Sequence, residues 1–296
     1  MTFLKEKHIV VSINKKIRLN DYLEGVFSSL PSNKSIKKAL LKGRILVDGK
    51  VATSALWVET NMKIDLLEDK NIERRNYDLE LEIIYEDDDF AIVNKPAGLV
   101  SSGNQFRTLQ NAVAGNLKAT SKINSIHPPK LVHRLDSATS GLVIIAKTSE
   151  AVQLFGNLLA EKQIHKKYIA IVKGETEDST TIDSKIGDKE ASTLLIKKET
   201  MVSDTLGSLS WLELYPQTGR THQLRIHLSE RGHPILGDRI YGDKEKDVKG
   251  KGLFLAAIAL EFYHPITKEQ MKFEIPIPKK FQKYWDGVKK RNATSN

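Results

Sequence analysis

Apolar residues recur every three or four positions in the first part of the chain, between Leu19 and Leu30. This spacing lines them up on one side of an α-helix, so the pattern predicts an amphipathic helix that Pro31 ends. A second short helix is predicted over 35–42, with lysines on one side and apolar residues on the other. The pair Asp48-Gly49, which follows a stretch of alternating apolar residues, is typical of a tight hairpin turn.

From Leu79 onward, segments with the hydrophobic pattern of strands are interspersed with segments that have the pattern of helices. Strands are expected on both sides of an acidic turn within 79–100, and at 142–146, 166–174, 252–265 and 271–278. Helices are expected directly after 142–146 and between a Thr221 N-cap and a Gly232 C-cap. This series predicts a mixed α/β (α+β) fold built on a largely antiparallel sheet.

The two patterns are separated by residues 68–78, a charged stretch almost free of large apolar residues. Such a composition is typical of a linker. The chain is therefore predicted to form a small α/β domain over 1–67, a larger domain over 79–288 and a frayed tail over 289–296. With 296 residues and 40% hydrophobic content, the chain is long enough to bury a core in both domains.

Charge narrows the choice of partner. The chain has 46 Lys and Arg against 37 Asp and Glu, a net charge of +9, which favours a polyanion, and nucleic acid ahead of an anionic membrane surface. The absence of cysteine excludes disulfides, thiolate zinc sites and a cysteine nucleophile. The first residues lack the apolar stretch of a signal peptide, and no apolar run approaches the roughly 18 residues of a membrane helix. We expect a cytoplasmic monomer without membrane contact.

Two segments of the first domain, "IRLNDYL" and "SIKKALLKGRILVDGK", combine two short helices, a basic helix face and a hairpin. Together they resemble the RNA-binding module named after ribosomal protein S4, and an S4-like domain of this kind implies RNA contacts on the basic face. The residues expected to make them are Lys34, Lys37, Lys38, Lys42 and Arg44. Composition alone fits an ordinary solvated face equally well. An arginine that often precedes the second helix in this module is replaced here by Asn33-Lys34, so that phosphate contact is not carried over.

Four segments of the larger domain are long and specific: "NKPAGLV", "VHRLDSATSGLVIIAK", "KKYIAIVKG" and "GRTHQLRIHLSERGHPILGDRIYG". In this order, over about Leu79 to Trp285, they are similar to the sequence blocks of the RluA-type family of RNA pseudouridine synthases. The resemblance implies an enzyme that isomerises uridine in RNA to pseudouridine without a cofactor. The appended RNA-binding domain favours large-subunit ribosomal RNA as its substrate, by family analogy.

One acid stands out in these segments. Asp136 lies in a polar loop that leads into the apolar strand at 142–146, where a carboxylate is costly unless something pairs with it. A loop aspartate followed by Ser and Thr is by itself more often a turn former than a catalytic group. The resemblance implies that Asp136 is the catalytic residue, acting as nucleophile or as base. It also implies that Arg225 is its partner, and a bidentate guanidinium would orient the carboxylate.

The resemblance implies roles for three further residues. Tyr168 would lie flat against a uracil flipped out of its stack. Flipping costs a few kcal/mol, and stacking on one aromatic ring offsets about 1 to 3 kcal/mol of that cost. Arg134 would fill the vacated stack or hold the flanking phosphate, and Leu255 would form the floor of the base pocket. From the residues alone, these three are a core tyrosine, a surface cation and a core leucine.

Other kinds of site find less support in the sequence. His222 and His227 are five residues apart, which does not place them on one helix face, so they and His233 are predicted to be structural and no metal is implied. A glycoside hydrolase needs two carboxylates that flank the bond, whereas Asp238 is predicted to shape its own loop. Two alternatives stay open: a catalytically silent RNA-binding ribosome assembly factor, and a pseudouridine synthase acting on tRNA.

Overall fold

The computed structural model describes residues 4–13, 15–67, 76–242, 248 and 250–294. The chain divides into two compact units, residues 1–74 (unit 1) and 75–296 (unit 2). The division falls inside the linker predicted over 68–78, of which residues 68–75 lie outside the described ranges.

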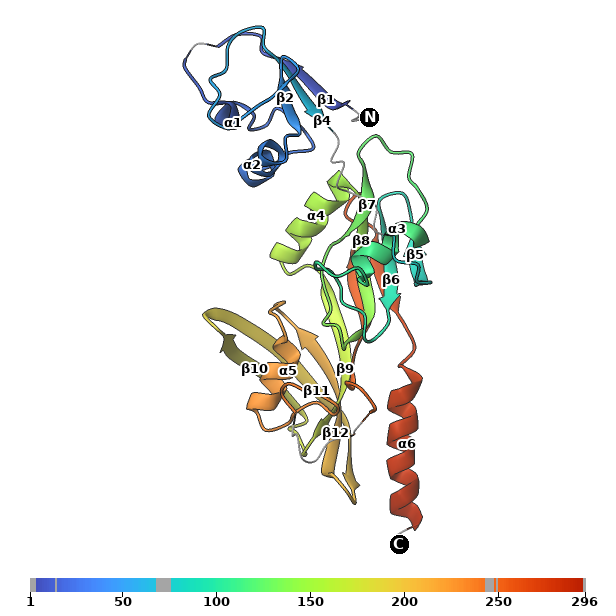
Figure 1. The fold of residues 1–296 in the computed structure, drawn as a ribbon. Helices are drawn as coiled ribbons and strands as arrows, with labels where there is room; N and C mark the ends of the chain where they lie inside the picture. The colour runs from blue at the N-terminus through green and yellow to red at the C-terminus, as the bar shows by residue number, and fades with distance from the viewer. Residues whose placement is uncertain (1–3, 14, 68–75, 243–247, 249, 295–296) are drawn as a thin grey trace. The chain divides into compact units, whose positions relative to one another are not determined.

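Unit 1 consists of a four-stranded sheet and two short helices (Figure 1). Its strands are β1 (Leu4–Ile9), β2 (Ile45–Val47), β3 (Lys50–Val51) and β4 (Lys63–Leu67), and its helices are α1 (Leu19–Tyr22) and α2 (Asn33–Leu41). The strand order is β1-β4-β2-β3, with antiparallel pairing at each step. Asp48 and Gly49 both have positive φ and form the predicted tight turn between β2 and β3.

The long helix predicted between Leu19 and Leu30 is wrong, because α1 is only four residues long. Gly25 has φ of +79°, which no right-handed helix accommodates, so the chain turns instead of continuing. The apolar positions are nevertheless buried, including Leu23 and Phe27. Helix α2 also begins earlier than predicted, because Ser32 is its N-cap in a reciprocal capping box with Ser35. Periodicity therefore identified the buried positions but not the backbone that carries them.

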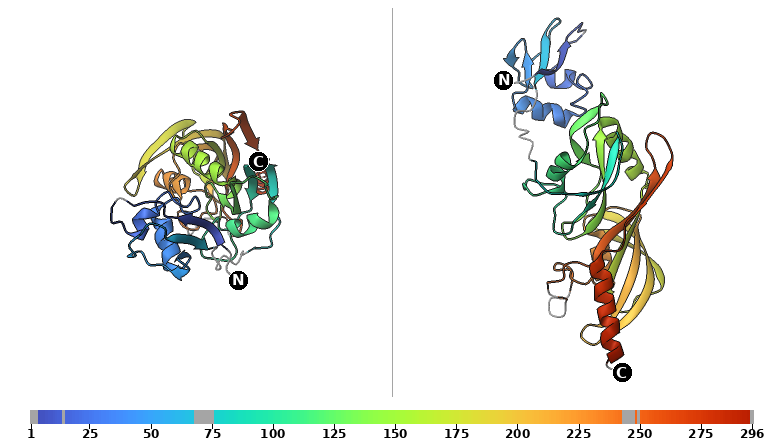
Figure 2. Two further views of the ribbon diagram at one scale, coloured as in Figure 1. Left: turned by 90° about the horizontal axis from the view of Figure 1, so that it is seen from above. Right: turned by 90° about the vertical axis from the view of Figure 1, so that its right-hand side faces the viewer.

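Unit 2 is built on a ten-stranded sheet with the order β10-β11-β12-β9-β13-β8-β6-β5, to which β14 is added through β13 and β7 through β8 (Figures 1 and 2). Its strands are β5 (Glu82–Glu86), β6 (Phe90–Lys95), β7 (Ser125–Leu131), β8 (Ser140–Thr148), β9 (His165–Lys173), β10 (Ser179–Ile186), β11 (Lys189–Ser203), β12 (Gly207–Pro216), β13 (Leu255–Tyr263) and β14 (Gln270–Glu274). Its helices are α3 (Leu109–Asn116), α4 (Ser149–Ala160), α5 (Gln223–Glu230) and α6 (Lys279–Thr294). Among the strand pairs described, β13 with β8 is the parallel one, so the prediction of a mixed fold with a largely antiparallel sheet is confirmed.

The centre of this sheet carries the elements of the site that is described below. Strands β8, β9 and β13 are neighbours, and β8 is buried from Gly141 to Thr148. A Cβ at Gly141 would collide with the backbone carbonyl oxygen of Ala257, so only glycine lets β8 and β13 approach this closely. The loop that ends at β8 is thereby held beside the first residue of β13, Leu255.

The end of the chain differs from the frayed tail predicted over 289–296. Helix α6 continues to Thr294, and residues 295–296 lie outside the described ranges. On α6, Trp285 Nε1 donates a hydrogen bond of 2.8 Å to Glu199 of β11, and the Lys289 ammonium lies 2.7 Å from the same carboxylate. Figures 1 and 2 show α6 lying along this part of the sheet. A helix with polar flanks is held here by partners about ninety residues earlier, which no local pattern reveals.

Candidate active site

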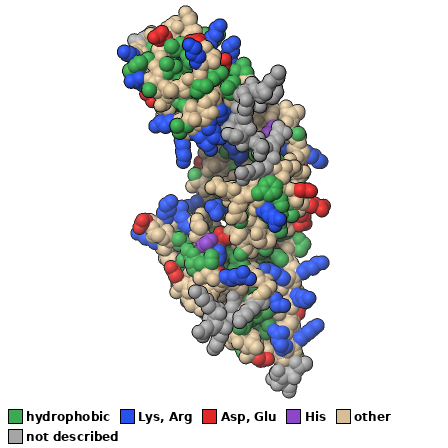
Figure 3. Space-filling model, viewed as in Figure 1, with side chains coloured by type: hydrophobic (Ala, Val, Ile, Leu, Met, Phe, Trp, Pro, Cys, Tyr) green, Lys and Arg blue, Asp and Glu red, His purple; other side chains and the backbone are tan. Residues whose placement is uncertain are grey.

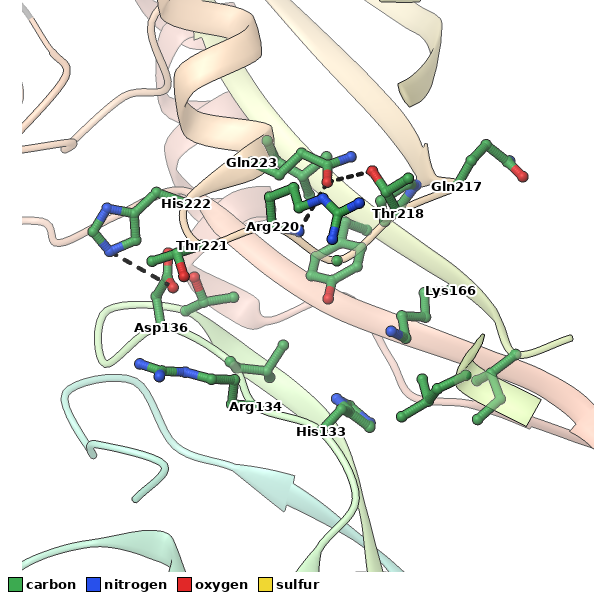
Figure 4. A pocket seen from close by; sticks show the side chains of 18 of the residues that line it. His133, Arg134, Asp136, Lys166, Gln217, Thr218, Arg220, Thr221, His222 and Gln223 are labelled. Carbon is green, nitrogen blue, oxygen red and sulfur yellow. Dashed lines mark hydrogen bonds and ion pairs between the residues drawn. The ribbon is translucent and has the colours of Figure 1, made fainter. Parts of the chain in front are cut away.

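A cavity of about 520 Å³ opens on unit 2 where four segments meet (Figure 4). Its walls come from the loop before β8, the end of α4 with the start of β9, the loop after β12 with the start of α5, and the first residue of β13. The residues that the sequence analysis proposed for chemistry and substrate binding all line it: Arg134, Asp136, Tyr168, Arg225 and Leu255. The volume is in the range of sites that bind small molecules.

Asp136 sits in a tight turn at the mouth of β8. The Thr139 amide donates to the Asp136 carbonyl oxygen, and the Gly98 amide donates to the carbonyl oxygen of Ser137, which ties the turn to the loop after β6. The Asp136 side chain is 18% exposed, so it is reachable from the cavity. Nη1 of Arg225 donates to Asp136 Oδ2 at 3.1 Å, and the His222 Nε2 atom lies 3.8 Å from Oδ1. The structure thus brings together the acid and the guanidinium that the sequence predicted as partners.

The guanidinium is not bidentate on Asp136 as predicted, because its fork is taken by Asp238. Arg225 Nε donates to Asp238 Oδ2 at 2.7 Å and Nη2 donates to Oδ1 at 2.8 Å, while Nη1 alone remains for Asp136. Asp238 also accepts hydrogen bonds from the amides of Ile240 and Tyr241, so it shapes its loop as predicted and in addition holds the arginine. Sequence reasoning missed this second role, and the isolated acid in "ILGD" was its only signal.

Burial and pairing act in opposite directions on this ion pair. Burial by itself would raise the pKa of Asp238, but hydrogen bonds from Arg225 and from two backbone amides outweigh it, so the pKa is lowered. Burial would lower the pKa of Arg225, and the hydrogen bonds to Asp238 and Asp136 reverse this and raise it. The pair is therefore ionised, and it presents Nη1 to the turn that carries Asp136 in a fixed direction.

Tyr168 projects from β9 and is buried in the wall of the cavity. Burial, followed by the negative charge of Asp136, raises the pKa of the Tyr168 hydroxyl well above its ordinary value. The phenol therefore stays protonated, so it can donate a hydrogen bond but is a poor base. Leu255 is also buried, on the neighbouring strand β13, which supports its predicted place in the floor of the cavity. Arg134, by contrast, is exposed at the rim (Figure 4).

The N-cap of helix α5 is His222 and not the predicted Thr221, and its first helical residue is Gln223. His222 has φ of +58°, an uncommon conformation for a residue other than glycine, and its Nδ1 lies 3.0 Å from the Tyr241 hydroxyl. This turn places Arg225 one helical turn further on, towards Asp136. In the part of the chain that the structure describes, no group of three His, Asp or Glu side chains is arranged to hold a metal ion.

Lys95 is a buried charge that the sequence analysis did not assign to the site. Its side chain is 0% exposed, and its ammonium donates to the carbonyl oxygens of Pro96 (2.9 Å), Leu99 (2.8 Å) and Ser137 (3.3 Å). The lysine therefore links the loop after β6 to the turn that carries Asp136. Burial lowers the pKa of Lys95 to about 8, although the negative charge of Asp136 acts in the opposite direction.

The lowered pKa of Lys95 predicts a measurable dependence of stability on pH. Above about pH 8 the folded protein releases this proton before the unfolded chain does, so the cost of burying the charge declines as the pH rises. The free energy of unfolding of the wild type, minus that of Lys95→Met, should increase by about 2 kcal/mol between about pH 7.5 and 9.5. Urea unfolding at both values measures it, and a constant difference would contradict a lysine that is charged and buried.

Comparison with known proteins gives a consistent result. The family described as RNA pseudouridylate synthase matches residues 89–230. An uncharacterized RNA pseudouridine synthase of Aquifex aeolicus is 31% identical over 93% of this chain and 95% of its own sequence. The ribosomal large subunit pseudouridine synthase D of Vibrio cholerae is 31% identical over 88% of each chain.

Solved structures agree with the sequence comparison. The human RNA pseudouridylate synthase domain containing 1 protein superposes with a TM-score of 0.54 at 27% identity, over 67% of this chain and 83% of its own.

None of the helices that the structure describes is long and apolar enough to cross a membrane.

Proposed function

Because this chain belongs to the family of RNA pseudouridine synthases, enzymes that isomerise uridine in RNA, we propose that it modifies large-subunit ribosomal RNA with Asp136 as its catalytic carboxylate. The observation that carries the proposal is the contact between Asp136 and Arg225 inside a cavity that Tyr168 also lines. A binding protein without catalytic activity has no need of an accessible acid that a buried ion pair holds in position.

The geometry supports a division of tasks within the reaction. The target uridine leaves its stack and enters the cavity, where Tyr168 offers an aromatic face and a protonated hydroxyl. Asp136 acts on the nucleoside as nucleophile or as base while the bond between N1 and C1′ breaks. After the base has turned, C5 bonds to C1′, the proton on C5 leaves and N1 gains one. Atoms balance without an oxidant, a reductant or a cofactor.

Two observations favour large-subunit ribosomal RNA over tRNA. Relatives from Vibrio cholerae and Vibrio vulnificus, each 31% identical to this chain over 88% of it, carry the name of ribosomal large subunit pseudouridine synthase D. Unit 1, which the sequence identifies as similar to an S4-like RNA-binding domain, supplies the second. Three of its lysines, Lys34, Lys37 and Lys38, are exposed on α2, and Figure 3 shows Lys and Arg side chains gathered over this helix. Arg44 is held instead by a hydrogen bond from Nε to the Leu67 carbonyl oxygen.

The α2 lysines provide a test of this RNA-binding surface. Changing Lys34, Lys37 and Lys38 to Gln should lower the slope of log affinity against log salt by about 2 to 3, because each lost phosphate contact removes one counterion release. Filter binding of a large-subunit RNA transcript at several salt concentrations measures the slope. Changing three exposed lysines of β1 and β4, Lys5, Lys7 and Lys63, is the matched control and should leave it nearly unchanged. Equal slopes for both triple variants would argue against an RNA-binding face on α2.

The reaction itself is tested by release of tritium from RNA labelled at C5 of uridine. Large-subunit ribosomal RNA, small-subunit ribosomal RNA and tRNA transcripts are compared at equal uridine concentration. We expect release from the large-subunit transcript, and chemical mapping of pseudouridine then locates the site. Release from tRNA alone would correct the substrate. No release from any of the three would favour the silent assembly factor.

A further inference from the structure

Strand β9 carries two adjacent lysines on opposite faces of the sheet. Lys167 lies 2.9 Å from Glu213 and 3.7 Å from Glu274, which raise its pKa against the effect of burial. Lys166 shares the other face with Tyr168, two residues further on, and lines the same cavity. In Figure 4, Lys166 and His133 lie at one end of the cavity, while Asp136 and His222 lie at the other.

Lys166 has no partner of its own among the residues that the structure describes. No hydrogen bond or ion pair to its ammonium is found there, although the side chain is largely enclosed and burial lowers its pKa. Its neighbour His133 cannot supply a counter-charge, because an imidazole is either neutral or positive. Burial and the charge of Lys166 lower the pKa of this imidazole to about 3. His133 is therefore neutral, and its Nε2 atom accepts a hydrogen bond of 3.3 Å from the Ile144 amide.

The rest of the cavity offers the Lys166 ammonium little negative charge. Asp136 is the one acidic residue among those that line it, and that carboxylate already faces Arg225. A largely enclosed cation without a counter-charge is costly, so the site favours a ligand that supplies a full negative charge. A uracil carbonyl would accept a hydrogen bond but leave the charge uncompensated. The phosphodiester of an RNA backbone accepts a hydrogen bond and also supplies the negative charge.

We propose that Lys166 binds the backbone phosphate next to the flipped uridine, and so fixes the position of that nucleotide while its base lies on Tyr168. The inference rests on the proposed function and adds a contact that positions the substrate. Residues two apart in a strand are about 7 Å apart, so a base on Tyr168 places its own sugar and phosphate within reach of the lysine. Other cations that line the cavity, Arg134 and Arg220 among them, would then contact the RNA backbone further from the flipped nucleotide.

The experiment compares Lys166→Gln with Lys167→Gln, its neighbour on the opposite face. For Lys166→Gln we expect about tenfold weaker binding of a large-subunit RNA transcript, with the salt slope reduced by about 0.7 to 0.9, the value for one phosphate. Lys166→Arg should restore the slope. Lys167→Gln should keep the wild-type slope, and thermal unfolding shows which variant is destabilised. Since Lys166 makes no described contact, its loss should not lower the melting temperature.

Phosphate-ethylation interference on the same transcript identifies the contact. Ethylation of one phosphate adjoining the modified uridine should exclude the RNA from the wild-type complex but not from the Lys166→Gln complex. An unchanged slope with an unchanged interference pattern would overturn the proposal. A loss of kcat at constant KM and constant slope would overturn it as well, since it places Lys166 on the reacting base. Failure of the proposed function would look different, because the wild type itself would then form no pseudouridine.

Discussion

Replacing Asp136 by Asn is expected to abolish pseudouridine formation, with turnover falling on the order of 10³-fold or more. The amide has nearly the shape of the carboxylate, but it is neither a comparable nucleophile nor a base. Arg225 keeps its two hydrogen bonds to Asp238, so the ion pair behind the site stays in place. Single-turnover release of tritium from the labelled transcript measures the effect.

The loss should be confined to chemistry. RNA affinity and melting temperature of Asp136→Asn should remain close to those of the wild type, because the side chain is partly exposed and makes one hydrogen bond to Arg225. Asp188→Asn, in the exposed turn between β10 and β11, is the matched control and should turn over normally. Appreciable release by Asp136→Asn would show that another group performs the reaction.

Replacing Arg225 by Met should damage both stability and catalysis. The change leaves the Asp238 carboxylate, which is 2% exposed, without its cation, and losing one partner of a buried pair costs about 3 to 5 kcal/mol. Activity should be lost as well, since the guanidinium that donates to Asp136 is then gone. Urea unfolding and tritium release measure the two effects separately.

The pH dependence of stability shows whether the unpaired Asp238 carboxylate causes the loss of stability in Arg225→Met. In the wild type the pKa of Asp238 is lowered, so this pair contributes stability above the unfolded pKa near 4 and loses it only as the pH falls below that value. In Arg225→Met the same carboxyl is buried without a partner and its pKa is raised. The folded state then takes up a proton more readily than the unfolded chain, so the variant should gain stability from about pH 8 to pH 5.5.

A double variant separates charge from catalysis. Arg225→Met combined with Asp238→Asn removes the stranded charge, so it should recover part of the lost stability at neutral pH and none of the activity. If the double variant is no more stable than Arg225→Met, the unpaired Asp238 carboxylate is not the cause of the lost stability. A single variant as stable as the wild type at pH 8 would mean that the ion pair contributes nothing.

Local patterns in the sequence were sufficient for several features. A continuous apolar run indicated the buried strand around Leu142 to Ala146, the series of expected strands indicated a largely antiparallel sheet, and the pair Asp48-Gly49 indicated a tight turn. The family resemblance selected Asp136, Tyr168 and Arg225, and the structure places all three in one cavity. The buried strand and the turn could be predicted locally, since an apolar pattern or a turn is complete within a short stretch of chain.

Apart from the contact between Asp136 and Arg225, which the family resemblance implied, tertiary structure alone decided which charged groups meet. The fork of Arg225 goes to Asp238, the ammonium of Lys95 holds the carbonyl oxygen of Ser137, and Lys166 faces the cavity while Lys167 faces two glutamates. The same holds for α6, which is anchored by Glu199. Periodicity records that a position is buried, whereas the partner of a buried charge depends on which distant segments the sheet brings side by side. The two members of such a pair are far apart in the sequence, so the spacing of residues along the chain does not show which charged groups will lie close together.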